Sequence, residues 1–408
     1  MASLPGLLAS MNAVTAQYNG YELHSVFQPI LSLCHRRSVG FESLLRPTDA
    51  ENHSHSPTDV IREASERGDI RQLDTLCQSL HIRNFSAQAP DERWLFLNLD
   101  PSTIADRWYH DGTLTRALRE AGVPPQRLVI EIVEGAIDDE PQLFAAVDYF
   151  RSIGALVALD DFGTGHSNFD RIWRLAPDII KLDRSLIVEA EQHRTGRLRQ
   201  MLPNLVSLIH EAGSLVLAEG IENREQALLA MDADIDFVQG FYFARPSRDI
   251  DHVEIDGLPV LGEITRHFET TTTIEERIEA DRIAPYANAF RDAIERIGDG
   301  ESPHTAARTL MSMPRAARFY ILNERGEEIM HVDGRSLRTR RIFHAGPITD
   351  TSGGTWYRRQ YFRAAMAEPH RLQTSRPYLS STGAYMCVTL SVARGRPPEQ
   401  VVCCDIDW

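Results

Sequence analysis

Short apolar runs alternate with amphipathic helical stretches between about residue 21 and residue 246. This alternation is typical of repeated βα units, which build a parallel sheet covered by helices. The candidate strands are residues 24–30, 38–45, 94–99, 128–132, 156–159, 179–182, 215–218 and 237–239. Apolar residues return every three or four positions in the stretches between them, at 57–85, 114–121, 142–153, 197–212 and 224–231. Eight strands in one stretch of this length predict an α/β fold, a TIM-like (β/α)8 barrel with an outer ring of helices.

The barrel pattern stops after Pro246, and we divide the chain into residues 1–250, 251–302 and 303–408. In the second part, residues 264–297 form a charged segment that predicts one or two connecting helices, weakened at Thr270–Thr273 and at Pro285. The third part predicts a smaller α+β domain, with strands at 318–322, 328–332, 385–392 and 401–408 and a helix at 356–366.

Charge and cysteine content exclude several classes of function. The formal net charge of -15 argues against binding to a nucleic-acid polymer, which requires a basic surface. The five cysteines are scattered and show neither a disulfide framework nor a zinc-ligand spacing, so a reducing cytoplasm is the expected location. No uninterrupted apolar run approaches the ~20 residues that cross a bilayer, so we expect no membrane insertion.

Acidic or amide side chains stand at or just beyond the end of nearly every predicted barrel strand. They are Glu42, Asn98, Glu131, Asp160, Asp161, Asp183, Glu219 and Gln239. The carboxyl ends of parallel barrel strands meet at one mouth, where their carboxylates would repel each other unless cations lay among them. Oxygen ligands without Cys or His favour Mg²⁺ or Mn²⁺. The alternative is that several of these acids are helix N-caps.

Lys181 is the only lysine of the chain, so 42 of the 43 cationic side chains are arginines. A lysine ammonium is a compact charge on a flexible stem, whereas a guanidinium is a planar fork. The run PDIIKLD at 177–183 predicts a buried strand that delivers Lys181 and Asp183 at its carboxyl end. We therefore expect a site that needs an ammonium group, with a chance surface lysine as the alternative.

Eight short motifs with polar or charged residues follow one another along the predicted barrel: FQP at 27–29, FESLLR at 41–46, LNL at 97–99, EIVE at 131–134, DDFGTG at 160–165, IKLDR at 180–184, AEGIE at 218–222 and QGFYFARP at 239–246. In order and spacing, these motifs resemble those of the EAL family of cyclic di-GMP phosphodiesterases. Ser43 stands where the family usually has Ala, and Val133 where it usually has Thr. The resemblance covers about residues 15 to 250.

The resemblance implies hydrolysis of cyclic di-GMP to linear pGpG, with two divalent ions, Mg²⁺ or Mn²⁺, assisting in-line attack of water. The implied metal ligands are Glu42, Asn98, Glu131, Asp160, Asp161 and Glu219. Lys181 and Gln239 are implied to contact the metal-bound water or the scissile phosphate, so that the catalytic set is Lys181, Asp161, Glu42 and Gln239. The residues implied to seat the dinucleotide are Gln28, Leu44, Arg46, Asp183 and Gln239. Glu134 resembles a glutamate that braces the 161–169 loop, and Glu222 an acid behind the metal ligands.

The order of strands after residue 303 resembles a PAS or Cache-type sensor domain, which implies a small-molecule ligand or a homodimer, and control of the barrel. Two other functions remain open at this point. One is a receptor that binds cyclic di-GMP without hydrolysing it and signals through the C-terminal domain. The other is a barrel glycosidase with two catalytic carboxylates, although neither the adjacent Asp160 and Asp161 nor the single lysine is explained by it.

Overall fold

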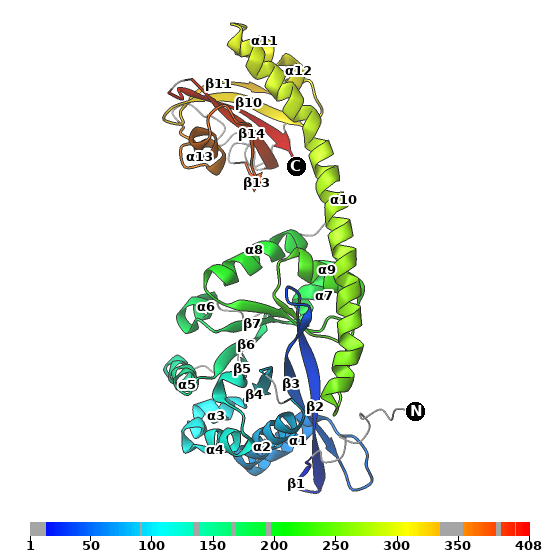
Figure 1. Cartoon of the computed structure of the whole chain (residues 1–408). Coiled ribbons are helices and arrows are strands. Elements are labelled where there is room, and N and C mark those ends of the chain that lie inside the picture. Colours follow the sequence, from blue (N-terminus) through cyan, green and yellow to red (C-terminus); the bar gives the residue numbers. More distant parts are fainter. Residues whose placement is uncertain are drawn as a thin grey trace, which may run out of the picture. The chain divides into compact units, whose positions relative to one another are not determined.

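The computed structural model describes residues 14–89, 92–133, 139–164, 169–192, 197–334, 354–380, 385–395 and 397–408. It divides into two units, Met1–Thr271 and Thr272–Trp408. Each unit has a sheet of its own (Figure 1). No helix among the described residues combines the length and the apolar character that a bilayer crossing requires.

The sheet of the first unit runs in sequence order from β1 to β9 and closes through a pairing of β9 with β2. Its strands are β1 (Ala16–Tyr18), β2 (Tyr21–Ser32), β3 (Arg37–Thr48), β4 (Trp94–Asn98), β5 (Leu128–Val133), β6 (Leu156–Phe162), β7 (Ile179–Leu182), β8 (Leu215–Ala218) and β9 (Phe237–Val238). Strands β2 to β9 form the barrel, which confirms the TIM-like fold predicted from the sequence.

One strand departs from the expected parallel arrangement. β2 pairs antiparallel with both β3 and β9, whereas β3 to β9 pair parallel with one another. The segment between the end of β2 at Ser32 and the start of β3 at Arg37 is too short for a crossover helix, so the two strands form a hairpin. The carboxyl end of β2 therefore lies opposite the mouth, and Gln28 reaches the mouth level by pairing with Glu42.

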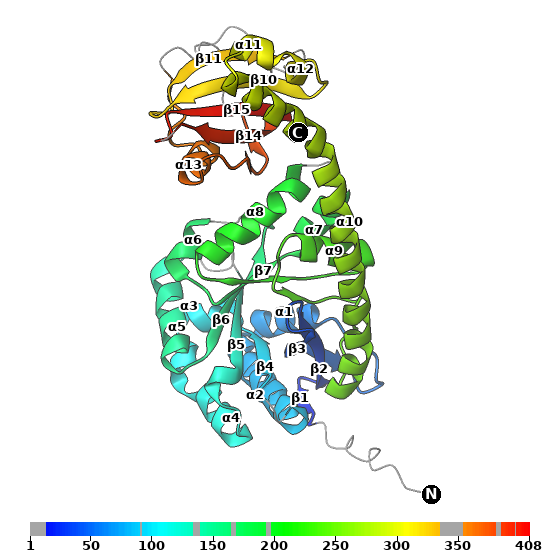
Figure 2. The same ribbon diagram turned by 45° about the horizontal axis from the view of Figure 1, so that its top comes forward.

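The helices of the first unit lie around the outside of the strands (Figure 2). They are α1 (Pro57–Arg67), α2 (Ile70–Gln88), α3 (Pro101–Ala105), η1 (Trp108–Asp111), α4 (Thr113–Ala121), η2 (Pro125–Arg127), α5 (Glu140–Ser152), α6 (Phe169–Leu175), α7 (Arg184–Gln192), α8 (Arg197–Glu211) and α9 (Arg224–Asp232). The single helix expected at 57–85 is two helices, because Gly68 adopts a left-handed conformation with φ of 76° and ends α1.

Two apolar layers hold the barrel together. The larger one lies between strands and helices and includes Phe41, Phe85 and Phe150. The smaller one fills the inside of the barrel with Ile30, Phe96, Val129, Ala158, Ile179, Leu217 and Phe237. Because neighbouring side chains of a strand point to opposite faces, each strand contributes to both layers.

Helix α10 (Ile250–Gly298) is one helix that starts in the first unit and ends in the second. We expected one or two helices at 264–297, weakened by Thr270–Thr273 and Pro285, and the structure has one that is longer at its amino end. In the second unit, Tyr286, Phe290 and Ala293 of this helix are buried. Their burial offsets the helix-breaking tendency of Pro285.

The second unit holds a sheet in the order β11-β10-β15-β14-β12, with β13 paired to β14. Its elements after α10 are α11 (Pro303–Ala306), α12 (Arg308–Met311), β10 (Ala316–Asn323), β11 (Glu328–Asp333), α13 (Gln360–Ala367), β12 (Gln373–Thr374), β13 (Tyr378–Leu379), β14 (Met386–Arg394) and β15 (Gln400–Asp407). The four strands and the helix expected after residue 303 correspond to β10, β11, β14, β15 and α13.

A buried polar group lies in the middle of this second sheet. The Asp405 carboxylate accepts hydrogen bonds from Tyr320 Oη at 3.1 Å and Thr389 Oγ1 at 2.7 Å. Burial raises the pKa of Asp405 to about 6, although the two hydrogen bonds act in the opposite direction. Cys403 and Cys404 precede it in β15 and are fully buried as free thiols.

Candidate active site

The predicted site residues form the next layer of the barrel interior above the apolar one. On each strand, the polar residue lies two positions from an apolar interior residue, so that both side chains point inward. The pairs are Ile30 and Gln28, Phe96 and Asn98, Val129 and Glu131, Ala158 and Asp160, Ile179 and Lys181, Leu217 and Glu219, and Phe237 and Gln239. The period of two that shapes each strand therefore also brings these polar side chains together.

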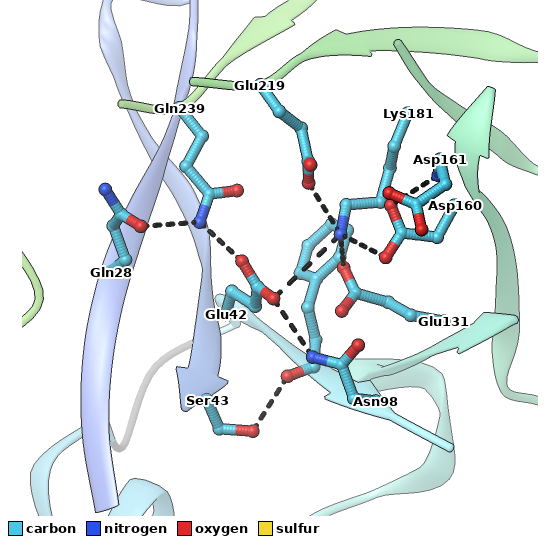
Figure 3. A network of polar contacts seen from close by, with 11 residues as sticks. Gln28, Glu42, Ser43, Asn98, Glu131, Asp160, Asp161, Lys181, Glu219 and Gln239 are labelled. Carbon is cyan, nitrogen blue, oxygen red and sulfur yellow. Dashed lines mark hydrogen bonds and ion pairs between the residues drawn. The ribbon is translucent and has the colours of Figure 1, made fainter. Parts of the chain in front are cut away.

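The Lys181 ammonium group is the centre of this polar layer (Figure 3). Its Nζ lies 2.6 Å from both Glu131 Oε1 and Glu219 Oε1, 3.2 Å from Asp160 Oδ2 and 4.0 Å from Glu42 Oε1. The lysine side chain is 1% exposed. One buried cation thus faces four carboxylates, and the alternative of a chance surface lysine is wrong.

Glu42 is held by two amide side chains. Asn98 donates from Nδ2 to Glu42 Oε1 at 3.0 Å, and Gln239 donates from Nε2 to Glu42 Oε2 at 2.6 Å. Gln239 Nε2 also donates to Gln28 Oε1 at 3.2 Å, and Gln28 donates to the carbonyl of Ala244 at 3.1 Å. Each oxygen of the Glu42 carboxylate thus accepts one amide N–H, and Oε1, which accepts from Asn98, is also the oxygen nearest Lys181 Nζ.

A local irregularity in β6 turns the second of two adjacent aspartates toward the mouth. The register of β6 against β7 shifts between Leu159 and Phe162, and Asp161 has a φ of 59°. The backbone N–H of Asp161 donates to Asp160 Oδ1 at 2.8 Å. In a regular strand Asp160 and Asp161 would point to opposite faces, and the bulge allows both to serve one site.

Burial and neighbouring charges shift the pKa values of several members of this cluster. Burial raises the pKa of Glu131 well above its usual value, and burial raises the pKa of Glu219 to about 8. Burial also acts to lower the pKa of Lys181, but the charges of Glu131 and Glu219 outweigh it, and the net shift is well upward. Burial and the charge of Asp160 raise the pKa of Asp161. The lysine is therefore charged, and the cluster favours further positive charge.

The donor set fits divalent cations that prefer oxygen. Carboxylate oxygens of Glu42, Glu131 and Glu219 lie within 4.8 Å of one another. Among the described residues, Glu131 Oε2 and Gln239 Oε1 are buried and accept no hydrogen bond. Buried acceptors without donors are costly, and a cation with oxygen ligands would satisfy them. The N-cap alternative does not describe Glu42, Glu131, Asp160 and Glu219, because these carboxylates face a lysine rather than the first turn of a helix. It does fit Asp183, which accepts a backbone N–H in the first turn of α7.

The remaining predicted residues lie in three different places. Leu44 and Arg46 line a pocket beside the cluster, together with Asn98. Asp183 is half-buried and its Oδ1 accepts the backbone N–H of Ser185 at the start of α7. Glu222 is exposed and pairs with Arg184 at 2.5 Å. Glu134 lies outside the described residues.

The pocket beside the cluster has a volume of about 310 Å³ and includes residues that we did not predict. Asp74 of α2 lines it and accepts from Gln78 Nε2 at 2.8 Å and from Thr103 Oγ1 at 2.7 Å. Burial raises the pKa of Asp74 to about 7. The signal for this residue was weak, because an acidic side chain on an amphipathic helix usually lies on the solvent side.

The EAL domain model matches residues 11–246, more than half of the chain. The chain is 28% identical over 235 residues to the probable cyclic di-GMP phosphodiesterase PdeI of Escherichia coli K12, a match that covers 55% of this chain and 29% of PdeI. It is 27% identical over 246 residues to the cyclic di-GMP phosphodiesterase RocR of Pseudomonas aeruginosa, covering 59% of this chain and 61% of RocR. Matches to three of the most similar curated relatives span only about a third or less of those proteins' length.

Solved structures show the same fold. The YkuI protein of Bacillus subtilis, which has an EAL domain and was solved with cyclic di-GMP and calcium, superposes with a TM-score of 0.79 at 20% identity, covering 95% of this chain and 96% of YkuI. BlrP1 of Klebsiella pneumoniae, solved with manganese and cyclic di-GMP, gives a TM-score of 0.51 at 24% identity over 58% of this chain and 59% of BlrP1.

Proposed function

The chain belongs to the EAL domain family, and from this premise we propose that it hydrolyses cyclic di-GMP to linear pGpG with the help of two divalent metal ions, Mg²⁺ or Mn²⁺. The observation that carries the proposal is the buried layer in which four carboxylates surround one ammonium group. Such a layer holds fewer cationic than acidic groups until metal ions bind. A barrel glycosidase would not need this arrangement, and membership of the family argues against it.

The residues that would hold the ions are Glu42, Asn98, Glu131, Asp160, Asp161 and Glu219. When bound, the ions supply positive charge that lowers the pKa of water and offsets the charge that develops at phosphorus. All six residues lie at the end of a barrel strand or next to it, on the side of the mouth. Figure 3 shows that five of them contact Lys181 or Glu42 or are Glu42 itself. Asp161 joins them through the bulge in β6.

The reaction adds one water across a phosphodiester bond. The water oxygen bonds to phosphorus, the bond from phosphorus to O3′ breaks, and O3′ takes up a proton, which opens the ring and leaves a 5′-phosphate. Lys181 Nζ carries three N–H donors and a fixed charge. It would orient the attacking water or a phosphate oxygen and stabilise the negative charge of the transition state. Gln239 is held by the hydrogen bonds that its Nε2 donates to Glu42 and Gln28, and its open Oε1 would accept a hydrogen bond from the attacking water.

The pocket next to the cluster would receive one guanine base. Leu44 and Pro101 give it apolar walls, and Arg46 stands at the same pocket. Asp74 offers a carboxylate to the two adjacent N–H donors of the guanine edge, and those donors would favour its charged form. Asp183 remains a predicted contact of the dinucleotide.

The test uses the purified full-length chain with cyclic di-GMP and Mg²⁺ or Mn²⁺, with and without a chelator, and separates the nucleotides by chromatography. We expect pGpG to form only with the metal, and Glu131→Gln to abolish its formation. The matched control is Asp49→Asn, because Asp49 belongs to a different group of metal-ligand side chains, with Glu51 and His53, and pairs with His53 and His55 rather than with Lys181. Binding without pGpG formation would instead support the non-hydrolysing receptor.

For the second unit we propose a sensory or dimerisation role that controls the barrel, with a PAS or Cache-like fold. Its buried Asp405, Tyr320 and Thr389 give it a polar interior that a small molecule could use. The five free cysteines agree with a cytoplasmic location. Light scattering of the full chain tests the homodimer, and thermal-shift screening against metabolites, with pGpG formation measured in parallel, tests regulation. A monomer that no metabolite stabilises would overturn this role.

A further inference from the structure

The pocket beside the carboxylate cluster contains a second polar residue whose role the proposed hydrolysis does not explain. His81 of α2 lines it and is 5% exposed. It lies seven residues, or two turns, after Asp74, so both side chains are on the same face of the helix and about 10 Å apart along its axis. One wall of the pocket therefore carries a carboxylate at one end and an imidazole at the other.

The His81 ring makes one hydrogen bond within the described part of the chain. Its Nδ1 lies 2.8 Å from Ser25 Oγ in β2. Burial lowers the pKa of His81 to about 4, so the ring is neutral and has one N–H. The other ring nitrogen, Nε2, has no partner among the residues that the structure describes. Which nitrogen holds the proton decides what the pocket offers to a ligand.

The surrounding hydrogen bonds determine this tautomer, beginning at the amino end of the described chain. The backbone N–H of Val14 donates to Asn84 Oδ1 at 2.8 Å, and Asn84 Nδ2 donates to the carbonyl of Val14 at 2.8 Å. This pair fixes which end of the Asn84 amide carries the N–H groups. The second hydrogen of Nδ2 is then directed to Ser25 Oγ, at 3.2 Å.

Ser25 determines which nitrogen of the His81 ring accepts a hydrogen bond. Because Ser25 Oγ accepts from Asn84, its own hydrogen is available for His81 Nδ1, the other partner it has among the described residues. Ser25 is buried, so a hydroxyl hydrogen pointing elsewhere would be unsatisfied. Nδ1 is therefore the acceptor, and the proton of the neutral ring resides on Nε2.

We propose that His81 is a specificity-determining residue that presents an Nε2–H donor to the base of the dinucleotide, at the end of the pocket opposite Asp74. The proposal rests on the proposed function, since it concerns the same substrate. A guanine offers N–H donors on one edge and the acceptors O6 and N7 on another, which complements a carboxylate and an imidazole N–H. With two hydrogen bonds of ~2.9 Å, a purine spans roughly the distance between the two residues.

Adenine does not match this pair of contacts. It carries an amino group where guanine has O6, so a fixed N–H donor would meet another donor, and a site built for hydrogen bonds rejects such a ligand strongly. His81 thus discriminates against adenine at one end of the base while Asp74 favours guanine at the other. Ser25 and Asn84 act as positioning residues, because they orient the proton without touching the ligand.

The test measures binding rather than turnover, with the full-length chain in Ca²⁺ and calorimetric titration of cyclic di-GMP and cyclic di-AMP. We expect the wild-type protein to prefer cyclic di-GMP. His81→Phe, which keeps the ring volume but removes the donor, should reduce the ratio of the two dissociation constants by about tenfold, the value of one hydrogen bond. Ser25→Ala should reduce this ratio less, because the His81 ring could then hold its proton on either nitrogen. A purely structural effect would weaken the binding of both ligands equally and would leave the ratio unchanged.

His24→Phe is the matched control, because His24 is another buried histidine of the barrel but does not line the pocket. Its ratio should equal that of the wild type. If His81→Phe does not fold, Ser25→Ala alone decides the question. An unchanged ratio in folded His81 and Ser25 variants that still bind cyclic di-GMP would overturn this inference and leave the proposed function standing. Failure of the wild-type protein to bind either dinucleotide would overturn both.

Discussion

Replacing Lys181 by methionine removes the only cation from the polar layer and leaves four carboxylates facing each other. The Lys181 side chain is 1% exposed and has carboxylate oxygens at 2.6, 2.6 and 3.2 Å. Removing one partner from a buried ion pair costs about 3–5 kcal/mol. At roughly 2 °C per kcal/mol for a unit of this size, the melting temperature of the barrel should fall by roughly 6–10 °C in the presence of a chelator.

Metal should reverse much of this loss, because bound cations neutralise the same carboxylates. In saturating Mn²⁺ we expect less than half of the destabilisation to remain. Turnover should still fall by about 10²–10³ or more, since one preorganised donor to the transition state is missing, whereas binding of cyclic di-GMP survives. Lys181→Arg should also be damaging, because the guanidinium is larger and planar.

Scanning calorimetry with and without Mn²⁺, together with pGpG formation, tests these values. Arg318→Met is the matched control, since Arg318 is a buried cation of the second unit and pairs with Glu328 at 2.9 Å. Its destabilisation should not respond to Mn²⁺. The reasoning fails if Lys181→Met loses the same stability with and without Mn²⁺, or if it keeps turnover within tenfold of the wild type.

Three further predictions concern pH, packing and the second unit. The folded pKa of Glu219 is raised to about 8 from a usual value of 4.5, so the stability that its protonation contributes is complete below pH 4.5 and is lost as the pH rises through 8. Urea midpoints of chelated protein should fall across this window, and saturating Mn²⁺ should flatten the decline. A Cβ at Gly240 would clash with the Ile221 carbonyl oxygen, so Gly240→Ala should destabilise the barrel by about 1–3 kcal/mol. It should also lower turnover, because it moves the neighbouring Gln239. Unchanged melting and kinetics would contradict this prediction. Asp405→Leu should destabilise the second unit by about 1–3 kcal/mol, because Tyr320 loses its acceptor. Asp405→Asn keeps an acceptor and should destabilise the unit less. Equal losses of stability in denaturant titrations would count against a role for that hydrogen bond.

The part of the site that follows strand periodicity could be predicted from the sequence. Lys181 stands two positions after Ile179, and Glu131 two after Val129, so a period of two in an apolar run already places them inside the barrel. The strand ends were also visible, because charge replaces apolar residues there. No comparable signal gave the bulge at Asp161, whose backbone conformation depends on the pairing of β6 with β7.

The residues of α2 could not be predicted in the same way. Asp74 and His81 share a face with apolar residues, and a helical pattern does not tell whether a polar residue on such a face meets solvent or a pocket. The antiparallel direction of β2 was also missed, since alternation defines a strand but not the direction of its partner. In α10, the low helix propensity of Pro285 predicted a break. The helix is continuous because the burial of Phe290 stabilises it across this position.

The apolar layer inside the barrel has a consequence for how such a protein can change over time. Ile30, Phe96, Val129, Ala158, Ile179, Leu217 and Phe237 fill the interior below the polar residues. Because this floor is complete without the acids above it, a descendant could exchange those acids one strand at a time and still close its barrel. The residues for catalysis and the residues for folding thus occupy different layers of the same strands. An ancestor with this interior could give rise both to enzymes and to proteins that bind without catalysis.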